Sequence, residues 1–359
     1  MSTMLDKRVL FLHDRSHGTL TQMLGWGSAL VARVVGPQLR NIPPSQAQYF
    51  ETSIRTTFTV DHASTSKAQV VTADKVDAVI VDIRSQAVQQ PGQIAKRFSH
   101  VPVVLFDSRA RADRLPDDSI LDNFDLVFKR EPWKDLDRYP CSPANRDKIV
   151  PTMISCRMFP HTAAGVRFPR WFRQLKGQKE SGSFPYQYDV SFIGKNTNQD
   201  RVETCLRIQR ESDLVSNVGL YFFDRYDKTV TATESERARL ATTQLNTVPY
   251  ARLIAASKVN LALEGLGQFT YRHLEIWSLA SFLLTTPVID EIQLPGVEQR
   301  SGVHYQTYNS VDDMIDKIRY YATHDAEREK IAAAAGALFS ELYDPQKHGE
   351  FIRERMFGA

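Results

Sequence analysis

The second half of the chain contains a loop with two glycines, where a backbone can approach a ligand closely. The apolar run 259–263 predicts a buried strand, and Glu264, Gly265 and Gly267 follow it. Glycine permits sharp turns, and its missing side chain leaves room for a bound group against the main chain. These residues predict a ligand-binding loop, and an ordinary turn is the alternative.

A helix is expected to begin after this loop, with Thr270 as its N-cap and Tyr271 as its first residue. Arg272 and Glu275 are three positions apart, so their side chains share one side of the helix near its start. Unpaired N–H groups and the positive end of the helix dipole attract anions at this end. We expect Arg272 to contact phosphate and Glu275 to accept hydrogen bonds from sugar hydroxyls. An ordinary surface ion pair between them is the alternative.

A similar arrangement occurs earlier in the chain. The run 188–193 predicts a strand that leads into a loop containing Gly194, Lys195 and Asn196, and a helix is expected from Arg201. Backbone N–H groups in such a loop can hold a diphosphate. Because the GxxxxGK[ST] pattern is absent, the loop does not indicate nucleoside triphosphate hydrolysis.

The first half of the chain alternates buried-type strands with helical stretches, which is typical of an open, doubly wound α/β sheet. The expected strands are 8–12, 56–60, 76–83, 101–106 and 124–128, and a helix is expected over 19–35. Ligands bind such sheets beyond the carboxyl ends of the strands. The polar residues at these positions are His13, Asp14, His17, Asp107, Arg109, Lys129 and Arg130.

His13 and Asp14 are the candidate catalytic residues of this half. An imidazole titrates near neutral pH, and burial can raise the pKa of a carboxyl group, so either side chain can act as a general base toward an acceptor hydroxyl. A solvated loop or a cap on the next helix is the alternative for both.

Composition and charge indicate a globular protein of about two domains, since the chain has 359 residues, 42% of them hydrophobic. The net charge of +3 is too small to indicate nucleic-acid binding, but it suits an anionic substrate or a loose contact with an acidic membrane surface. Cys141, Cys156 and Cys205 are scattered and lack metal or redox spacing, which predicts reduced thiols and a cytoplasmic location. No apolar run is long enough for a signal peptide or a membrane span.

The expected organisation has four parts. An N-terminal α/β domain covers residues 1–175, a polar linker 176–187, and a C-terminal α/β domain 188–340. A terminal helix in 341–359 carries apolar residues that can pack back on the first domain, and a solvated helix is the alternative.

Three segments resemble the nucleotide-binding half of exostosin-like and spore-maturation-type glycosyltransferases of the GT-B fold. They are YDVSFIGK (188–195) with Arg201, SKVNLALEGLGQFTYRHLEIWSLASFLLT (257–285) and DDMIDKIRYYATHDAEREKIAAAAG (312–336). The resemblance implies two Rossmann-like doubly wound α/β domains that face a central cleft. It implies a nucleotide-sugar donor held by the second domain, a hydroxyl acceptor on the first, and no metal or cofactor.

Carried onto this sequence, the resemblance implies a donor-binding set in which Gly194 and Lys195 lie near the diphosphate, Arg272 lies by the phosphates and Glu275 binds the ribose or the sugar. The full predicted set is Gly194, Lys195, Asn196, Arg201, Glu264, Gly265, Gly267, Tyr271, Arg272 and Glu275. Retaining enzymes of this fold often have two glutamates eight positions apart, whereas Glu264 and Glu275 are eleven apart, so the stereochemical course stays open. An inverting route would take its base, His13 or Asp14, from the first domain.

The leading hypothesis is a metal-independent glycosyltransferase that moves a sugar from a nucleotide diphosphate to a hydroxyl of a glycan, a lipid-linked acceptor or a small molecule. A nucleotide-sugar epimerase or hydrolase on the same frame is one alternative. A non-catalytic ligand-binding α/β protein is the other.

Overall fold

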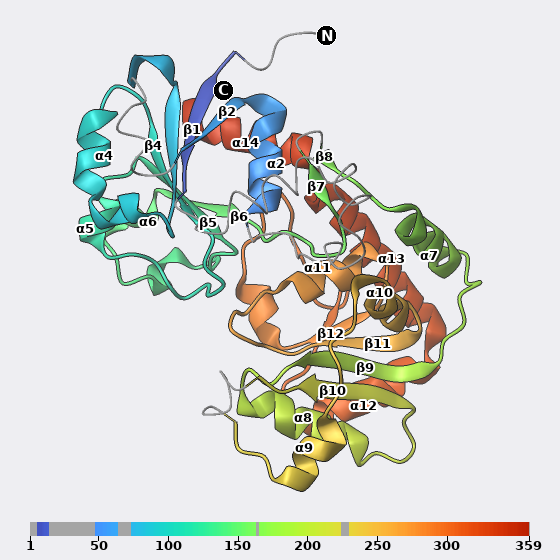
Figure 1. Ribbon diagram of the computed structural model, residues 1–359. Helices are drawn as coiled ribbons and strands as arrows, with labels where there is room; N and C mark the ends of the chain where they lie inside the picture. The colour runs from blue at the N-terminus through green and yellow to red at the C-terminus, as the bar shows by residue number, and fades with distance from the viewer. Residues whose placement is uncertain (1–5, 14–46, 64–72, 163–164, 224–229, 359) are drawn as a thin grey trace, which may run out of the picture.

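The computed structural model describes residues 6–13, 47–162, with a gap at 64–72, then 165–223 and 230–358. Figure 1 shows an upper lobe built on one parallel sheet and a lower lobe built on a second. Asp14, His17 and the helix expected over 19–35 lie outside the described residues.

The upper sheet has six parallel strands in the order β2-β1-β3-β4-β5-β6. Its strands are β1 (Arg8–Leu12), β2 (Thr59–Ala63), β3 (Ala78–Asp82), β4 (Val103–Asp107), β5 (Leu126–Arg130) and β6 (Ile149–Thr152). Its helices are α2 (Gln48–Thr57), α4 (Pro91–Arg97), α5 (Asp118–Leu121) and α6 (Pro143–Arg146). The central strands are apolar along most of their length because helices cover both faces of such a sheet.

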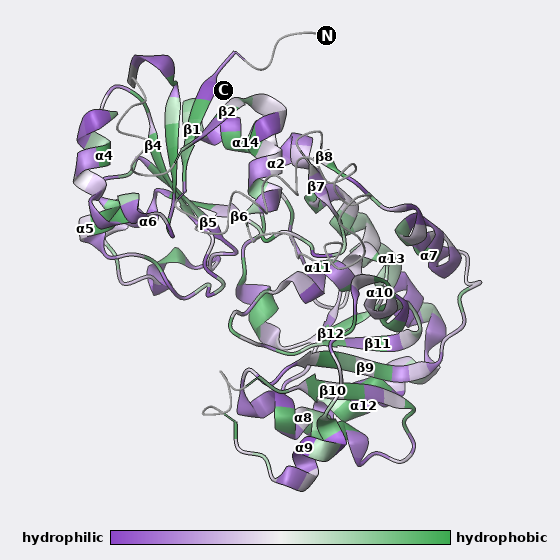
Figure 2. Cartoon of the chain, in the orientation of Figure 1, coloured by the Kyte–Doolittle hydropathy of each residue, from purple (hydrophilic) through white to green (hydrophobic). Residues whose placement is uncertain are grey.

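The lower sheet has five parallel strands in the order β10-β9-β11-β12-β13. They are β9 (Tyr188–Lys195), β10 (Ser216–Tyr221), β11 (Ser257–Ala262), β12 (Leu283–Thr285) and β13 (Gln306–Thr307). The helices of this lobe are α8 (Gln199–Gln209), α9 (Glu234–Leu240), α10 (Thr247–Ala255), α11 (Tyr271–Ser278), α12 (Val311–Thr323) and α13 (Asp325–Leu342). In Figure 2 the strand β9 is green along its middle, where its buried apolar residues lie.

The segment of the chain between the two sheets forms the short antiparallel strands β7 (His161–Thr162) and β8 (Gly165–Val166), which lie against α2, and the helix α7 (Arg170–Glu180), which lies against α10. Residues 176–180 of the predicted linker therefore form the last part of α7. The terminal helix α14 (Pro345–Phe357) returns to the upper lobe, where Ile352 and Met356 lie in one apolar cluster with Val9 and Phe11. A larger apolar cluster contains residues of both sheets, so the lobes share packed side chains where the chain crosses between them.

The prediction of two doubly wound α/β sheets is confirmed, but two local predictions were wrong and one strand was not predicted. The strand expected over 56–60 was placed too early, because residues 56 and 57 still belong to α2 and β2 begins at Thr59. These β-branched residues are typical of strands, but here they end a helix whose inner face is buried. The strand β6 was missed because Pro151 argues against a central strand, and β6 is an edge strand, where proline is tolerated. Gly194 and Lys195 are not a loop: they end β9, paired with Leu220 and Tyr221 of β10.

Candidate functional site

Gly194 and Arg272 meet at the carboxyl end of β9. The Arg272 guanidinium donates a hydrogen bond from Nη2 to the Ile193 carbonyl oxygen at 2.5 Å and lies over the Phe192 ring, 4.2 Å from its centroid. A Cβ at position 194 would stand 2.8 Å from the Phe192 ring and 3.2 Å from Arg272 Nη2. The glycine is therefore required so that an arginine from α11 can lie against the strand end.

Arg201 joins the ends of β9 and β11. Its guanidinium donates from Nε to the Glu264 carbonyl (2.7 Å), from Nη1 to the Lys195 carbonyl (3.0 Å) and from Nη2 to the Leu263 carbonyl (2.8 Å). Burial and the nearby Arg272 lower the pKa of Arg201 to about 10. All three nitrogens of Arg201 already have backbone acceptors. Arg201 therefore holds in place the loop after β11 that contains Gly265 and Gly267, which we call the glycine loop.

The remaining predicted residues of this region have partners of their own. Asn196 is buried and accepts a hydrogen bond from the Phe223 backbone N–H at 2.9 Å, and Lys195 Nζ lies 4.6 Å above the Phe223 ring. Glu264 accepts a hydrogen bond from the Thr286 hydroxyl at 2.9 Å. These contacts fix the loops that follow β9, β10 and β12.

The helix α11 begins as predicted, with Thr270 as its N-cap. The Thr270 N–H donates to Nδ1 of His273 at 3.1 Å, and burial lowers the pKa of His273 to about 3, so this imidazole stays neutral and can accept. The cap directs the first turn of α11, which carries Tyr271 and Arg272, toward the strand ends.

Glu275 is buried with an incomplete set of partners. The residue is only 3% exposed, and its Oε2 has no hydrogen-bond partner among the described residues. Burial raises the pKa of Glu275 to about 7, although the positive charges of Arg157 and Arg272 oppose this rise. Arg272 is also buried, so Arg272 and Glu275 do not form a surface ion pair, which was the alternative interpretation of their spacing.

Arg157 is a residue of this site that the sequence did not reveal. It comes from the irregular segment after β6, and its guanidinium lies 4.8 Å from the centroid of the Tyr271 ring. Tyr221 and Glu275 interact electrostatically with both Arg157 and Arg272, and Tyr250 interacts with Arg272. We refer to the set Arg157, Tyr221, Tyr250, Tyr271, Arg272 and Glu275 as the strand-end cluster.

In the upper lobe, His13 follows β1, and one of its ring nitrogens, Nε2, lies 3.0 Å from Nδ1 of His62. His62 also contacts Arg55. The other predicted base, Asp14, lies outside the described residues. His13 is half-buried at the edge where the ends of β1 and β3 meet, which is the point where the strand order reverses.

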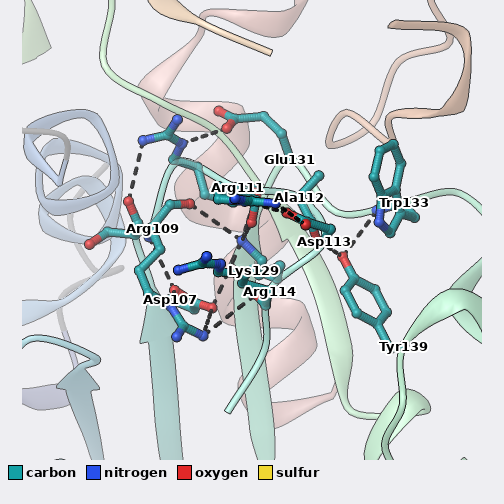
Figure 3. Close-up of polar contacts among 12 residues, drawn as sticks. Asp107, Arg109, Arg111, Ala112, Asp113, Arg114, Lys129, Glu131, Trp133 and Tyr139 are labelled. Atoms are coloured by element: carbon teal, nitrogen blue, oxygen red, sulfur yellow. Dashed lines mark hydrogen bonds and ion pairs between the residues drawn. The ribbon is translucent and has the colours of Figure 1, made fainter. Parts of the chain in front are cut away.

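The other polar strand ends of the upper lobe form the buried network in Figure 3. Arg109 donates two hydrogen bonds to the Asp107 carboxylate at 2.9 and 2.8 Å, and Lys129 Nζ donates to the Arg111 carbonyl at 3.0 Å. Asp107 and Lys129 are fully buried, and burial lowers the pKa of Lys129. The network therefore holds the loop 107–114 rather than facing a substrate.

This loop touches the glycine loop of the lower lobe. The Ala112 N–H donates to the Gln268 side-chain oxygen at 3.0 Å, and a Cβ at Gly267 would overlap the Ala110 carbonyl. Gly267 therefore serves contact between the lobes, whereas Gly265 leaves room for Arg201, whose Nη2 would stand 2.7 Å from a Cβ there.

Within the described residues, no group of three or more histidine, cysteine, aspartate or glutamate side chains is arranged to hold a metal ion. None of the helices there combines the length and apolar character that crossing a membrane requires.

Comparison with known proteins gives two findings at the level of sequence. The sequence model of the glycosyl transferase-like family matches residues 218–353, which include β11, α11 and the glycine loop. No curated protein matches the chain significantly.

Solved structures match over nearly the whole chain. HepE from Anabaena, solved with UDP-glucose, has a TM-score of 0.51 at 11% identity and covers 97% of this chain and 98% of its own. A glycosyltransferase from Rickettsia africae has a TM-score of 0.54 at 11% identity, covering 98% and 99%. Sucrose-phosphate synthase from Thermosynechococcus elongatus has a TM-score of 0.53 at 8% identity, covering 97% and 98%.

Because these sequence identities are low, the structural matches establish the fold alone. The family match covers the part of the chain that contains most of the strand-end cluster. The predicted resemblance to GT-B glycosyltransferases is confirmed at this level. The chain therefore has the GT-B fold of glycosyltransferases, and its residues 218–353 match the sequence model of the glycosyl transferase-like family.

Proposed function

We propose that the protein is a glycosyltransferase that moves a sugar from a nucleotide diphosphate to a hydroxyl acceptor. The observation that carries the proposal is the strand-end cluster, where Arg272 lies against Gly194 and the buried Glu275 keeps an oxygen without a hydrogen-bond partner among the described residues. Guanidinium groups suit a diphosphate, and a buried carboxylate oxygen suits a sugar hydroxyl. The fold match to HepE, a structure with UDP-glucose, makes a uridine nucleotide the first donor to test.

In the proposed reaction the acceptor hydroxyl loses its proton to a base, and its oxygen forms a bond to the anomeric carbon while the bond from that carbon to the diphosphate breaks. Arg157 and Arg272 would stabilise the negative charge that develops on the leaving diphosphate. We propose no need for a metal or another cofactor, because these guanidiniums can supply the positive charge.

We propose His13 as the acceptor base, with Asp14 as its alternative. The position of His13 at the end of β1 and its contact with His62 support this role, since a neighbouring imidazole can fix the tautomer in which His13 accepts a proton. Both inverting and retaining outcomes are compatible with the glutamate spacing.

We also propose a cytoplasmic location. All three cysteines are free and buried, as expected for a chain kept in a reducing compartment. Acceptors consistent with the proposal are glycans, lipid-linked sugars and small molecules with a hydroxyl.

A thermal-shift screen of nucleotide diphosphates and their sugars tests the donor assignment, because a ligand that binds only the folded protein raises its melting temperature. We expect at least one nucleotide diphosphate sugar to stabilise the wild type and to stabilise Arg272→Ala much less. Release of nucleotide diphosphate that does not depend on any acceptor would favour a hydrolase instead. If no nucleotide shifts the melting temperature, the proposal fails.

A further inference from the structure

The helix α7 carries an exposed basic face that the proposed reaction does not use. Arg167 precedes the helix, and Arg170 and Arg173 lie one turn apart on it; all three are exposed. Phe172 and Leu175 point into the core, so the arginines lie on the opposite side. In Figure 1 α7 stands at the outer edge of the molecule beside α10, and in Figure 2 it is largely purple.

A groove of about 470 Å³ lies between α7 and α10. Arg173 and Arg252 bring positive charge to it from the two helices, and Trp171 and Val248 bring apolar surface. Phe168, just before α7, is 40% exposed and Val248 is 36% exposed. We define the α7 face as Arg167, Phe168, Arg170, Trp171, Arg173, Val248 and Arg252.

The arginines of the α7 face have no salt bridges within the described residues, although many other surface arginines of the chain do. Arg138 pairs with Glu291, Arg300 with Glu298 and Arg319 with Asp213. The single carboxylate of α7, Glu180, lies at the far end of the helix and is 3.7 Å from Lys176. Arg173 and Arg252 therefore bring two positive charges without acidic partners in the described part of the chain to one groove, and Arg167 and Arg170 add two more near the start of α7.

The apolar residues decide which kind of anion this surface fits. A free phosphate would gain nothing from an exposed phenylalanine, a partly exposed tryptophan and an exposed valine. A bilayer offers both negatively charged headgroups and an apolar layer beneath them, and aromatic rings beside basic side chains are typical of proteins that lie on it. A nucleic acid is disfavoured because the overall charge is only +3.

We propose that the α7 face binds the surface of a bilayer that contains acidic phospholipids. The arginines lie at the headgroups, while Phe168, Trp171 and Val248 enter the interface below them. This inference does not rest on the proposed function, since it concerns a different surface and can be measured without any sugar donor. If both hold, bilayer binding brings the enzyme to acceptors at a membrane surface.

Co-sedimentation with vesicles tests the proposal on the full chain. We expect the protein to sediment with vesicles of phosphatidylglycerol in phosphatidylcholine and to stay in solution with phosphatidylcholine alone. The double variant Arg170→Ala with Arg173→Ala removes two of the four charges and should weaken binding by at least about tenfold. The variant Phe168→Ser should weaken binding while leaving the charge unchanged.

The matched control is Arg207→Ala with Arg319→Ala, which removes the same charge from surface arginines on α8 and α12. It should bind acidic vesicles like the wild type, with circular dichroism confirming that both double variants fold. Equal weakening in the control would overturn the proposal, because overall charge would then explain binding. So would equal binding to phosphatidylcholine vesicles, full release by millimolar inorganic phosphate, or binding to RNA that outcompetes the vesicles.

Discussion

At the scale of single residues, the arginines of the site differ in how many of their guanidinium nitrogens donate hydrogen bonds within the protein. Arg201 donates from three nitrogens to backbone carbonyls, whereas Arg272 donates from Nη2 to the Ile193 carbonyl. A guanidinium that is buried, positioned and only partly engaged is suited to bind an anion, because little side-chain entropy is lost on binding. Arg272 is therefore the residue on which donor affinity should depend most.

The substitution Arg272→Ala should weaken nucleotide diphosphate binding by about 1.5–3 kcal/mol, as expected when a charge-assisted hydrogen bond is lost in a partly buried site. Isothermal titration calorimetry measures the change, with Arg272→Lys as a variant that keeps the charge but not the forked geometry. Arg300→Ala, at an exposed pair with Glu298, is the control and should bind normally. Equal affinities for Arg272→Ala and this control would remove Arg272 from the site.

Glu275 predicts a specific dependence of stability on pH. Because its pKa is raised to about 7 in the folded protein, the folded state binds the proton more tightly than the unfolded state. The stabilisation is fully present below the unfolded pKa and is lost as pH rises through about 7. The loss should be on the order of 3 kcal/mol.

Urea unfolding at pH 5 and pH 8 measures this effect. The wild type should lose more unfolding free energy between the two pH values than Glu275→Gln, whose amide cannot ionise. Identical pH dependence in the two proteins would show that Glu275 titrates normally. A donor whose sugar hydroxyl hydrogen-bonds the carboxylate should bind the wild type more tightly at pH 8 than at pH 6 and should bind the variant equally at both.

At the scale of elements, the site depends on how the ends of β9 and β11 are held beside the start of α11. The proximity of Gly194 and Arg272 was predictable, since parallel strands end at one edge of a sheet and the helix that follows begins there. Arg157 was not predictable, because it lies in an irregular segment whose path is set by packing between the lobes. The structural role of Arg201 was also hidden, because it depends on carbonyls more than 60 positions away in sequence.

The substitution Gly265→Ala should disturb this arrangement through Arg201. Its Cβ would stand 2.7 Å from Arg201 Nη2, and this side chain can yield only by giving up hydrogen bonds to the Leu263 and Glu264 carbonyls. We expect a loss of about 1–3 kcal/mol of unfolding free energy. Chemical denaturation measures this loss. A variant as stable as the wild type would show that the hydrogen bonds of Arg201 to these carbonyls do not stabilise the fold.

Gly177→Ala is the matched control for that variant. Gly177 lies inside α7, and a Cβ at this position would point into open space, so alanine there should be neutral or stabilising by up to about 1 kcal/mol.

At the scale of the whole molecule, the two lobes meet through two loops. Each loop is held in its conformation by side chains of its own lobe. The Asp107–Arg109–Lys129 network holds the upper loop, Arg201 holds the lower one, and Gly267 permits them to touch. The sequence predicted two lobes but not this contact, since the buried lysine and the glycine come from segments that only the tertiary fold brings together.

Gly267→Ala should force the lobes apart at this point, because a Cβ there overlaps the Ala110 carbonyl. Since the proposed donor-binding residues Arg272 and Glu275 lie in the lower lobe, donor affinity should change little, whereas turnover should fall by about 10- to 100-fold as the proposed acceptor side is displaced. Calorimetry and initial rates measure the two quantities. A loss of donor affinity as large as the loss of turnover would contradict this view of the contact.

The most direct test of the account is a crystal structure with the nucleotide diphosphate sugar that raises the melting temperature most. We expect diphosphate oxygens about 2.7–3.2 Å from the guanidinium nitrogens of Arg272, beside Gly194, and a hydroxyl of the ligand hydrogen-bonded to Glu275. A nucleotide bound elsewhere, with the strand-end cluster unchanged from its ligand-free contacts, would contradict it.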